Sequence, residues 1–312
     1  MSGNSIAIAG APATRARSGR RAGKGKLRLR RNVPLREAII GSFAGVLLVA
    51  RRCTATADSE PARSVHDFRK SLRRARSVVA LLRPALGRTA AGGLTEGLRS
   101  AFRSTSDLRD ADVLTATLAG LAGDDPELFV EAAEVAARVS ANSKDVRPEK
   151  VLREAIPILR RLPGALEVTL PREYSTPDLE EGLARGYRRA QRAWAAASER
   201  RTDAEFHEWR KRVKELRYQL ELLASHGSST LKAREKALGA LARELGEVTD
   251  QALLCRRIES GDGGGAPGSA SRLLERGRAA VRERSDELLS RGGAFFSDTP
   301  KAFARRVLAE RG

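Results

Sequence analysis

The sequence contains few of the residues that form metal sites, disulfide frameworks or base-stacking surfaces. Its 312 residues include two cysteines and three histidines, and only 4% are aromatic. Cys53 and Cys255 lack metal-site spacing, and two thiols make no disulfide framework, so a zinc finger and a small disulfide-rich fold are excluded. This cysteine content is typical of a reducing, intracellular setting. β-Branched runs and period-2 alternation are scarce, so little indicates β-strands.

Long hydrophobic runs are also missing. The most apolar run, 38–50, has 13 residues, short of the roughly 20 that a membrane-spanning helix needs. We interpret it as a core helix entered through Pro34 at a first-turn position. Residues 1–32 contain no acidic residue and no apolar stretch of the secretory kind. We therefore interpret them as a basic, flexible N-terminal arm rather than a targeting peptide.

Positive charge dominates the composition. The 58 lysines and arginines exceed the 39 acidic residues, which gives a net charge of +19 and a pI of about 11.0. The 41% hydrophobic content is ordinary for a globular protein. A compact chain this basic repels itself unless a polyanion or an acidic surface offsets the charge. A folded protein with a polyanionic partner is therefore expected.

Stretches rich in Ala, Leu, Arg and Glu predict an all-α protein. The predicted helices span about 35–54, 62–85, 93–122, 126–143, 148–162, 177–200, 203–224, 230–260, 271–291 and 299–310. Pro84 with Gly87, GDDP at 123–126, RRLPG at 160–164 and HGSS at 226–229 predict breaks between them.

The same pattern suggests how the chain is organised. After the arm, a main helical domain is expected at 33–260, with halves at about 33–123 and 176–260 joined by a helical connector. The glycine-rich stretch at 261–271 is interpreted as a flexible linker. The C-terminal helices within 272–312 are then expected to pack as an appendage.

Two stretches 141 residues apart carry a histidine and four cations in one pattern. They are VHDFRKSLRRARSVVALL at 65–82 and FHEWRKRVKELRYQLELL at 206–223. At offsets 0, 3, 4, 7 and 10 the first has His66, Arg69, Lys70, Arg73 and Arg76, and the second has His207, Arg210, Lys211, Lys214 and Arg217. Two further stretches, DLRDADVL at 107–114 and GEVTDQALL at 246–254, also agree. We therefore expect an internal repeat that forms two pseudo-symmetric helical bundles.

The spacing places the matched residues on one face of each helix. The five offsets fall within an arc of roughly 120°, and an apolar stripe that includes Phe68 or Trp209 occupies the opposite face. One basic face alone is typical of a solvated surface. Like charges at these spacings destabilise a helix, however, and this cost occurs twice. The pattern therefore favours a ligand that neutralises the charge, and a neutral histidine there can donate a hydrogen bond to a phosphate oxygen.

The units HxxRKxxRRxR at 66–76 and HxxRKRVKELRY at 207–218 resemble the CHAD family, the conserved-histidine α-helical domain. LRDADVL and LGEVTD are similar to the later-helix motifs of that family, and the resemblance extends over about 33–260. It implies two helical bundles around a basic groove that binds inorganic polyphosphate, with the ten matched residues as candidate phosphate ligands. Thr249 departs from the pattern, because Asn before Asp is more usual there.

On the same resemblance, Arg74 and Arg212 are weaker candidate phosphate ligands. Nothing before residue 33 is similar to the glutamate-rich first strand of the CYTH triphosphatase domain, often fused to CHAD, so a stand-alone CHAD protein is expected. The first helix of each half could add cations, although exposed solubilising arginines explain them equally well: Arg51, Arg52, Arg185, Arg188, Arg189 and Arg192.

Non-specific nucleic-acid binding is the main alternative. The charge alone would allow it, with strong weakening by salt. Single-strand binding normally adds aromatic platforms for the bases. Here Trp194, Trp209 and most of the eight phenylalanines fall on apolar stripes. We therefore favour polyphosphate as the partner.

A metal-dependent phosphohydrolase is the second alternative. The pair His66–Asp67 is similar to part of an HD site, but the second copy has Glu208 in place of Asp67. The aspartates of DLRDAD at 107–112 have no histidine or glutamate set to complete a two-metal centre. We expect Asp250, and Asp110 in the other half, to orient neighbouring arginines by ion pairs.

The sequence thus predicts an all-α, non-enzymatic, cytoplasmic protein that binds inorganic polyphosphate without a cofactor or metal. Both basic helices are expected to face a shared groove and to neutralise successive phosphates. No membrane partner is indicated, and the oligomeric state stays open. Association with polyphosphate granules, protection of the polymer and recruitment of an enzyme are all compatible with this prediction.

Overall fold

The computed structural model describes residues 26–30, 32–105, 107–141, 147–225, 227–260 and 271–311, without the side chains of 107–114 and 138–141. The elements in these ranges are α1 Leu35–Arg52, the 3₁₀ turn η1 Cys53–Thr56, α2 Pro61–Arg103, α3 Asp107–Ala122, α4 Pro126–Ala141, α5 Pro148–Glu154, α6 Ile156–Thr169, α7 Thr176–Arg200, α8 Asp203–Leu223, α9 Ser229–Glu259, α10 Ser271–Phe295 and α11 Pro300–Ala309. No strand occurs among them, and the predicted all-α class is confirmed. The repeat relation between the halves stays a prediction.

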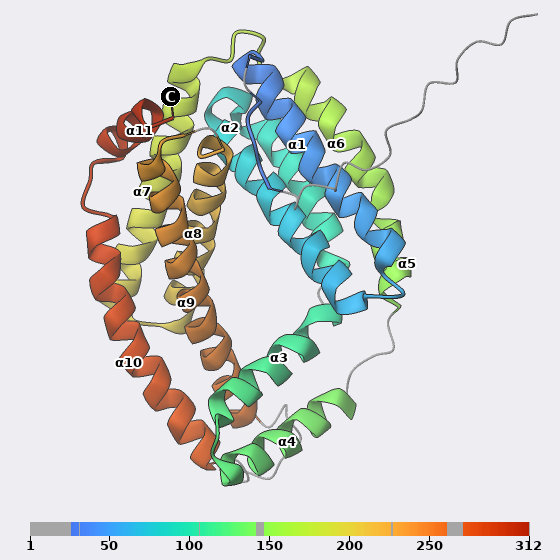
Figure 1. Ribbon diagram of the computed structural model, residues 1–312, viewed down its shortest axis with the longest axis vertical. Helices are drawn as coiled ribbons and strands as arrows, with labels where there is room; N and C mark the ends of the chain where they lie inside the picture. Colours follow the sequence, from blue (N-terminus) through green and yellow to red (C-terminus); the bar gives the residue numbers. More distant parts are fainter. Residues whose placement is uncertain are drawn as a thin grey trace, which may run out of the picture.

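The helices form two groups that meet at one end (Figure 1). One group contains α1, α2, α5 and α6, and the other contains α7 to α11. Helix α2 packs directly on α7 and α8, so it joins the two groups. Helices α3 and α4 close the opposite end, where α3 packs on α9 and both contact α10.

One large core holds both groups together. It includes Phe43 of α1, Phe68 of α2, Tyr187 of α7 and Trp209 of α8, each with no exposed surface. The prediction that Phe68 and Trp209 are core residues is confirmed. Burial of a large apolar side chain contributes about 1.5–3 kcal/mol. A separate, smaller cluster that includes Leu118 and Leu128 packs α3 and α4 together with Leu254 of α9 and Leu273 of α10.

The break predicted at Pro84 with Gly87 is confirmed, because α2 consists of two helical arms separated by a sharp turn at Gly87. Gly87 has φ +72, a left-handed conformation that glycine adopts without a side-chain clash. The turn gives α2 a first arm, 61–86, and a second arm, 88–103. The arms lie antiparallel, because Arg69 of the first contacts Thr105 just after the second. The predicted helix at 93–122 is therefore divided between α2 and α3.

The break expected at RRLPG, 160–164, was wrong. Helix α6 runs through Pro163, and the chain breaks earlier, at Ala155 between α5 and α6. Proline inside a helix removes one backbone hydrogen bond and costs about 3 kcal/mol. Leu159, Leu162 and Leu166 are buried on one face of α6 on both sides of the proline. Burial of this continuous apolar face offsets the local cost.

The first helix is longer than the apolar run suggested. Leu35–Thr56 forms a helical segment with a mean hydropathy of 1.5. By length and composition this segment could cross a membrane, but the core helices of soluble proteins can be equally long and apolar. Helix α1 packs against α2 and α6 and buries Ile39, Phe43 and Leu47 in the main core. This packing is that of a core helix.

The prediction of a flexible arm over all of 1–32 needs correction. Residues 1–25 and 31 lie outside the described residues, but Leu27 and Leu29 are buried in the main core. The Leu27 amide donates to Glu221 Oε1 at 2.9 Å, and the Leu29 amide donates to Ser225 Oγ at 3.2 Å. Leu27 and Leu29, which alternate with basic residues, thus anchor residues 26–30 against α8 and Ser225.

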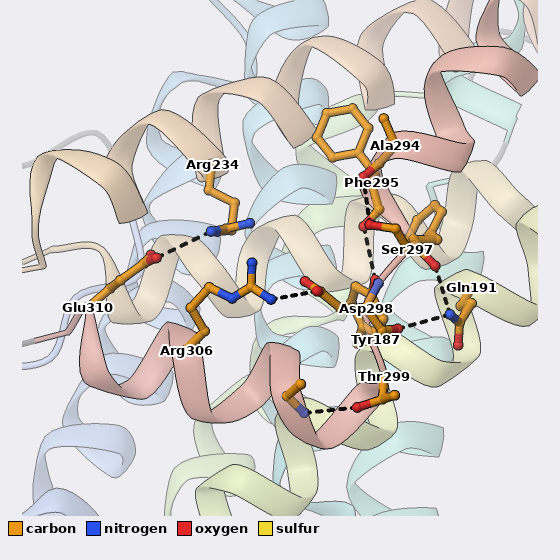
Figure 2. A network of polar contacts seen from close by, with 12 residues as sticks. Tyr187, Gln191, Arg234, Ala294, Phe295, Ser297, Asp298, Thr299, Arg306 and Glu310 are labelled. Atoms are coloured by element: carbon orange, nitrogen blue, oxygen red, sulfur yellow. Dashed lines mark hydrogen bonds and ion pairs between the residues drawn. The ribbon is translucent and has the colours of Figure 1, made fainter.

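The expectation that the C-terminal helices form an appendage was also wrong. The Tyr187 hydroxyl of α7 donates to the Phe295 carbonyl at 3.0 Å and accepts from the Asp298 amide (Figure 2). Its ring stacks on Phe303 of α11, with 4.1 Å between centroids. Arg234 of α9 binds Glu310 at 3.2 Å. These contacts integrate α10 and α11 into the main core, while the predicted linker at 261–270 lies outside the described residues.

Candidate anion-binding site

The two predicted basic helices, α2 and α8, pack directly against each other. Helix α7 packs closely against both α2 and α8 and fixes their positions. A Cβ atom at Gly182 of α7 would overlap the Leu81 carbonyl oxygen of α2, and one at Gly186 would overlap the Gln219 side chain of α8. The backbone contact at Gly182 requires glycine, whereas at Gly186 the end of the Gln219 side chain would have to move. The three helices therefore form a tight junction around which the cations gather.

Arg69 is committed to the fold. Only 7% of the residue is exposed, and its Nη1 donates to the Thr105 carbonyl at 2.7 Å and to the Thr105 hydroxyl at 2.9 Å. Its guanidinium lies over the Phe102 ring, 4.0 Å from the centroid. Arg69 thus fastens the two arms of α2 together, and we regard it as a structural member of the stripe.

Phe102 is a platform for three arginines of the α2 stripe. Arg73 and Arg76 also lie over its ring, at 5.5 and 6.0 Å from the centroid. A cation over an aromatic face is stabilised by the ring quadrupole. Sequence reasoning missed Phe102, because it lies 26–33 residues from these arginines and meets them only through the turn at Gly87.

Two half-buried cations of the α2 stripe are only partly compensated, by the longer-range charges of Asp67 and Glu221 for Lys70 and of Glu215 for Arg76. Burial and the charge of Arg74 lower the pKa of Lys70, and Arg217 of α8 adds to this effect. Burial and the charge of Arg99 lower the pKa of Arg76. In the described part of the chain, no carboxylate lies within ion-pair distance of Lys70 or Arg76. Positive charge is therefore concentrated here at an electrostatic cost.

Two arginines of the α8 stripe, Arg210 and Arg217, are balanced by carboxylates of the next helix. Arg210 donates to the Thr249 hydroxyl at 2.7 Å and to both oxygens of Asp250, at 2.9 and 3.3 Å. It lies across Gly246 of α9, where a Cβ would be 3.2 Å from its Nη2. The prediction that Asp250 orients an arginine is confirmed. Thr249, where the family pattern favours Asn, supplies a second acceptor.

The cations of the α8 stripe other than Arg210 differ in their ion-pair partners and in their burial. Arg217 donates from Nε to Glu235 at 2.9 Å and lies across Gly239 of α9. Lys211 is exposed and pairs with Glu208 of its own helix at 2.7 Å. Lys214 is half-buried. Arg210 and Arg217 thus find their carboxylates on α9, outside the motif, whereas Lys211 finds its partner within it.

The two histidines lie at the exposed N-terminal ends of the stripes. His66 lines a cavity of about 690 Å³ together with residues of α3, α9 and α10, including Thr117, Asp250 and Arg284. His207 is exposed. Partial burial and the charges of Lys211 and Arg210 lower the pKa of His207 below its ordinary value of 6.5. Its imidazole is therefore mostly neutral near pH 7, as the sequence predicted.

The cations of α7 extend the basic surface. Arg189 donates to Glu215 of α8 at 2.8 Å, and Arg212 binds the other oxygen of Glu215 at 3.0 Å. Arg185 is half-buried, whereas Arg188 and Arg192 are exposed. The weaker candidate Arg74 is buried in an ion pair with Glu221 and is structural.

The aspartate motif at 107–112 adds no described side chain to the site. The side chains of Asp107, Asp110 and Asp112 lie outside the described residues, so their expected roles stay predictions. In the part of the chain that the structure describes, no three His, Cys, Asp or Glu side chains are grouped so that they could hold a metal ion.

Comparison with known proteins gives one family and one fold. The family model "CHAD domain" matches residues 47–259. The crystal structure of the CHAD domain from the plant Ricinus communis is similar, with a TM-score of 0.53 and 21% sequence identity over 91% of this chain and 94% of that one. No curated protein sequence matches the chain. The family match covers both basic helices and the junction between them, and the chain belongs to the CHAD domain family.

Proposed function

We propose that this protein binds inorganic polyphosphate at the α2–α8 junction and performs no chemistry on it. One observation carries the proposal: Lys70 and Arg76 are half-buried, repelled by neighbouring cations and not paired with a carboxylate in the described residues. A bound polyanion would offset this repulsion. Membership of the CHAD family and the similarity to the Ricinus CHAD domain support the fold on which the site is built.

The cations suit a polymer of phosphates better than a nucleic acid. Arginine presents a planar fork of donors and lysine a point charge, and both bind phosphate oxygens. Base stacking needs an open aromatic face, but the Phe102 ring is already covered by Arg69 at 4.0 Å. Trp209 is fully buried. A ligand without bases therefore fits this surface best.

The proposed mechanism is electrostatic. Lys70, Arg73 and Arg76 would contact phosphates from α2, while Lys214 of α8 would contact them from the facing helix. Arg210 and Arg217 already bind carboxylates, so they contribute mainly long-range attraction. His66 and the largely neutral His207 would each donate one hydrogen bond to a phosphate oxygen.

Charge reversal tests this proposal. Arg73→Glu combined with Lys214→Glu should abolish binding of long-chain polyphosphate and leave the fold intact, because both side chains are only half-buried. Arg160→Glu with Arg161→Glu, two exposed arginines of α6, changes the net charge equally and is the matched control. Binding by titration calorimetry and helix content by circular dichroism are the measurements. Equal binding by the two double variants would contradict the site assignment.

A further inference from the structure

Two arginines of α7 are brought against α2 and α8 by the glycines that precede them. The α7 sequence GLARGYRR, 182–189, places an arginine three residues after each glycine, at Arg185 and Arg189. Gly182 and Gly186 form the close contacts with α2 and α8, and residues three apart are neighbours on a helix surface. The close approach therefore places both arginines beside the cations of the other helices.

The resulting arginine cluster consists of Arg76 and Arg83 of α2, Arg185 and Arg189 of α7, and Arg212 of α8. Burial, then the charges of Arg189 and Arg83, lower the pKa of Arg185. Burial also lowers the pKa of Arg189, and the charges of Arg212 and Arg83 contribute. The cluster thus contains arginines from three helices that are close enough to repel one another.

Carboxylates compensate only part of this charge. Glu215 binds Arg189 at 2.8 Å and Arg212 at 3.0 Å. Glu208 also binds Arg212 and is shared with Lys211. Among the described residues, no carboxylate pairs with Arg76, Arg83 or Arg185, and Nη1 of Arg185 is buried without a hydrogen-bond partner. A buried, unsatisfied donor is costly unless a ligand binds it.

The cluster continues the α2 stripe. Arg69, Arg76 and Arg83 follow one another at seven-residue intervals, so they drift by only about 20° per step and share one face. His66 and Arg83 are separated by about 26 Å along the helix axis. Arg76 belongs to both sets, because Arg212 is among the charges that lower its pKa.

The α8 stripe has no such continuation. The position seven residues after Arg217 is Ala224, so the cations end there. The extended basic face exists on the α2 side only, and the pattern of the two repeats does not predict it.

We propose that the arginine cluster is a second phosphate subsite, which makes the protein select long polyphosphate chains over tripolyphosphate. This inference rests on the proposed function. A long chain can contact both the Lys70–Arg73 region and the Arg83–Arg185 end of the cluster, because Arg73 and Arg83 lie about 15 Å apart along the helix axis. Three phosphates are too few to span that length. Contacts made by one tethered chain add without a second loss of translational freedom.

The double variant Arg83→Gln with Arg185→Gln tests the inference, because neither side chain has a carboxylate partner that the change would orphan. Arg160→Gln with Arg161→Gln on α6 removes the same net charge and is the control. Titration calorimetry with long-chain polyphosphate and with tripolyphosphate measures both affinities. The ratio of the long-chain to the tripolyphosphate affinity should fall about tenfold, or about 1.4 kcal/mol, in the cluster variant and stay unchanged in the control.

The outcomes separate the two proposals. A ratio equal to that of the control, in a protein that still binds polyphosphate, overturns the second subsite and leaves the proposed function in place. Wild-type protein that binds neither polymer overturns both. The melting temperature of the cluster variant should be equal to or above that of wild type, because the change removes repulsion; a purely structural role for these arginines would lower it.

Discussion

Arg74 of α2 and Glu221 of α8 form a two-pronged ion pair at 2.8 and 2.9 Å, with side-chain exposures of 4% and 7%. The Leu27 amide donates to the same carboxylate. The pair joins the two helical groups and the N-terminal segment at one point. It lies beside Lys70, whose pKa responds to both charges. The junction that carries the candidate site is therefore held by a buried charge pair.

Removing one partner of this pair should destabilise the protein strongly. Arg74→Met leaves Glu221 buried without its counter-charge, and such a change costs about 3–5 kcal/mol. Urea unfolding followed by circular dichroism measures the loss. The double variant Arg74→Met with Glu221→Leu removes both charges and should recover part of it, because the Leu27 amide also loses its acceptor. A double variant no more stable than the single one would contradict this account.

The close contact of α7 with α2 should not tolerate a methyl group. Gly182→Ala places a Cβ atom against the Leu81 carbonyl, and such overpacking typically costs about 1–3 kcal/mol. Gly41→Ala in α1 is the matched control, because nothing lies within 4 Å of its Cβ position. That change should stabilise the helix by about 0.5–1 kcal/mol. Thermal unfolding distinguishes the two, and equal shifts of melting temperature would contradict the packing.

Phe102 should stabilise the α2 arms through its ring. Phe102→Leu keeps an apolar side chain but removes the aromatic face under Arg69, Arg73 and Arg76, at an expected cost of about 0.5–2 kcal/mol. Phe129→Leu on α4, where the ring is 61% exposed, is the control and should cost less. Chemical unfolding of both variants measures the difference. A smaller loss for Phe102 than for Phe129 would argue against the platform.

The lowered pKa of His207 predicts a pH dependence. The unfolded state binds a proton at His207 more readily than the folded state does. The stability that the neutral imidazole contributes to the folded state is therefore fully present above pH 6.5, the ordinary pKa of histidine. It is lost as the pH falls from there through the folded-state pKa. His207→Gln should flatten the dependence in that window. An NMR titration of His207 with a midpoint at or above 6.5 would contradict the prediction.

The same histidine should respond to the ligand. Polyphosphate near His207 would raise the pKa of the imidazole, because negative charge favours the protonated form. Binding should therefore take up a proton and tighten as the pH is lowered towards 5.5. Calorimetry in buffers of different ionisation enthalpy measures this uptake, and its absence would place the ligand away from His207.

Local patterns predicted most of the helices but little of what lies between them. The matched offsets placed each stripe correctly on one face, because helical period depends only on nearby residues. The balancing acids could not be found this way. Glu235 is 18 and Asp250 is 40 residues from the arginines that they bind, and Glu221 is 147 from Arg74. These pairs exist only after the helices pack.

The arginine cluster shows the same limit. The cations of α7 were visible in the sequence, but exposed solubilising arginines explained them equally well. What distinguishes Arg185 from exposed Arg188 is the approach of α7 to α2 at Gly182. Pro163 is a further case, because burial of the α6 apolar face decides against a strong local signal for a break.

The most direct test of the central claim is a competition between polyanions. Purified protein is titrated with long-chain polyphosphate and, in parallel, with single- and double-stranded DNA of matched charge, at about 0.15 M and about 0.5 M salt. The account predicts that polyphosphate binding survives the higher salt while DNA binding is lost, because the site is shaped for phosphates without bases. Equal binding to all three that disappears at the higher salt would contradict it and leave only a non-specific basic surface.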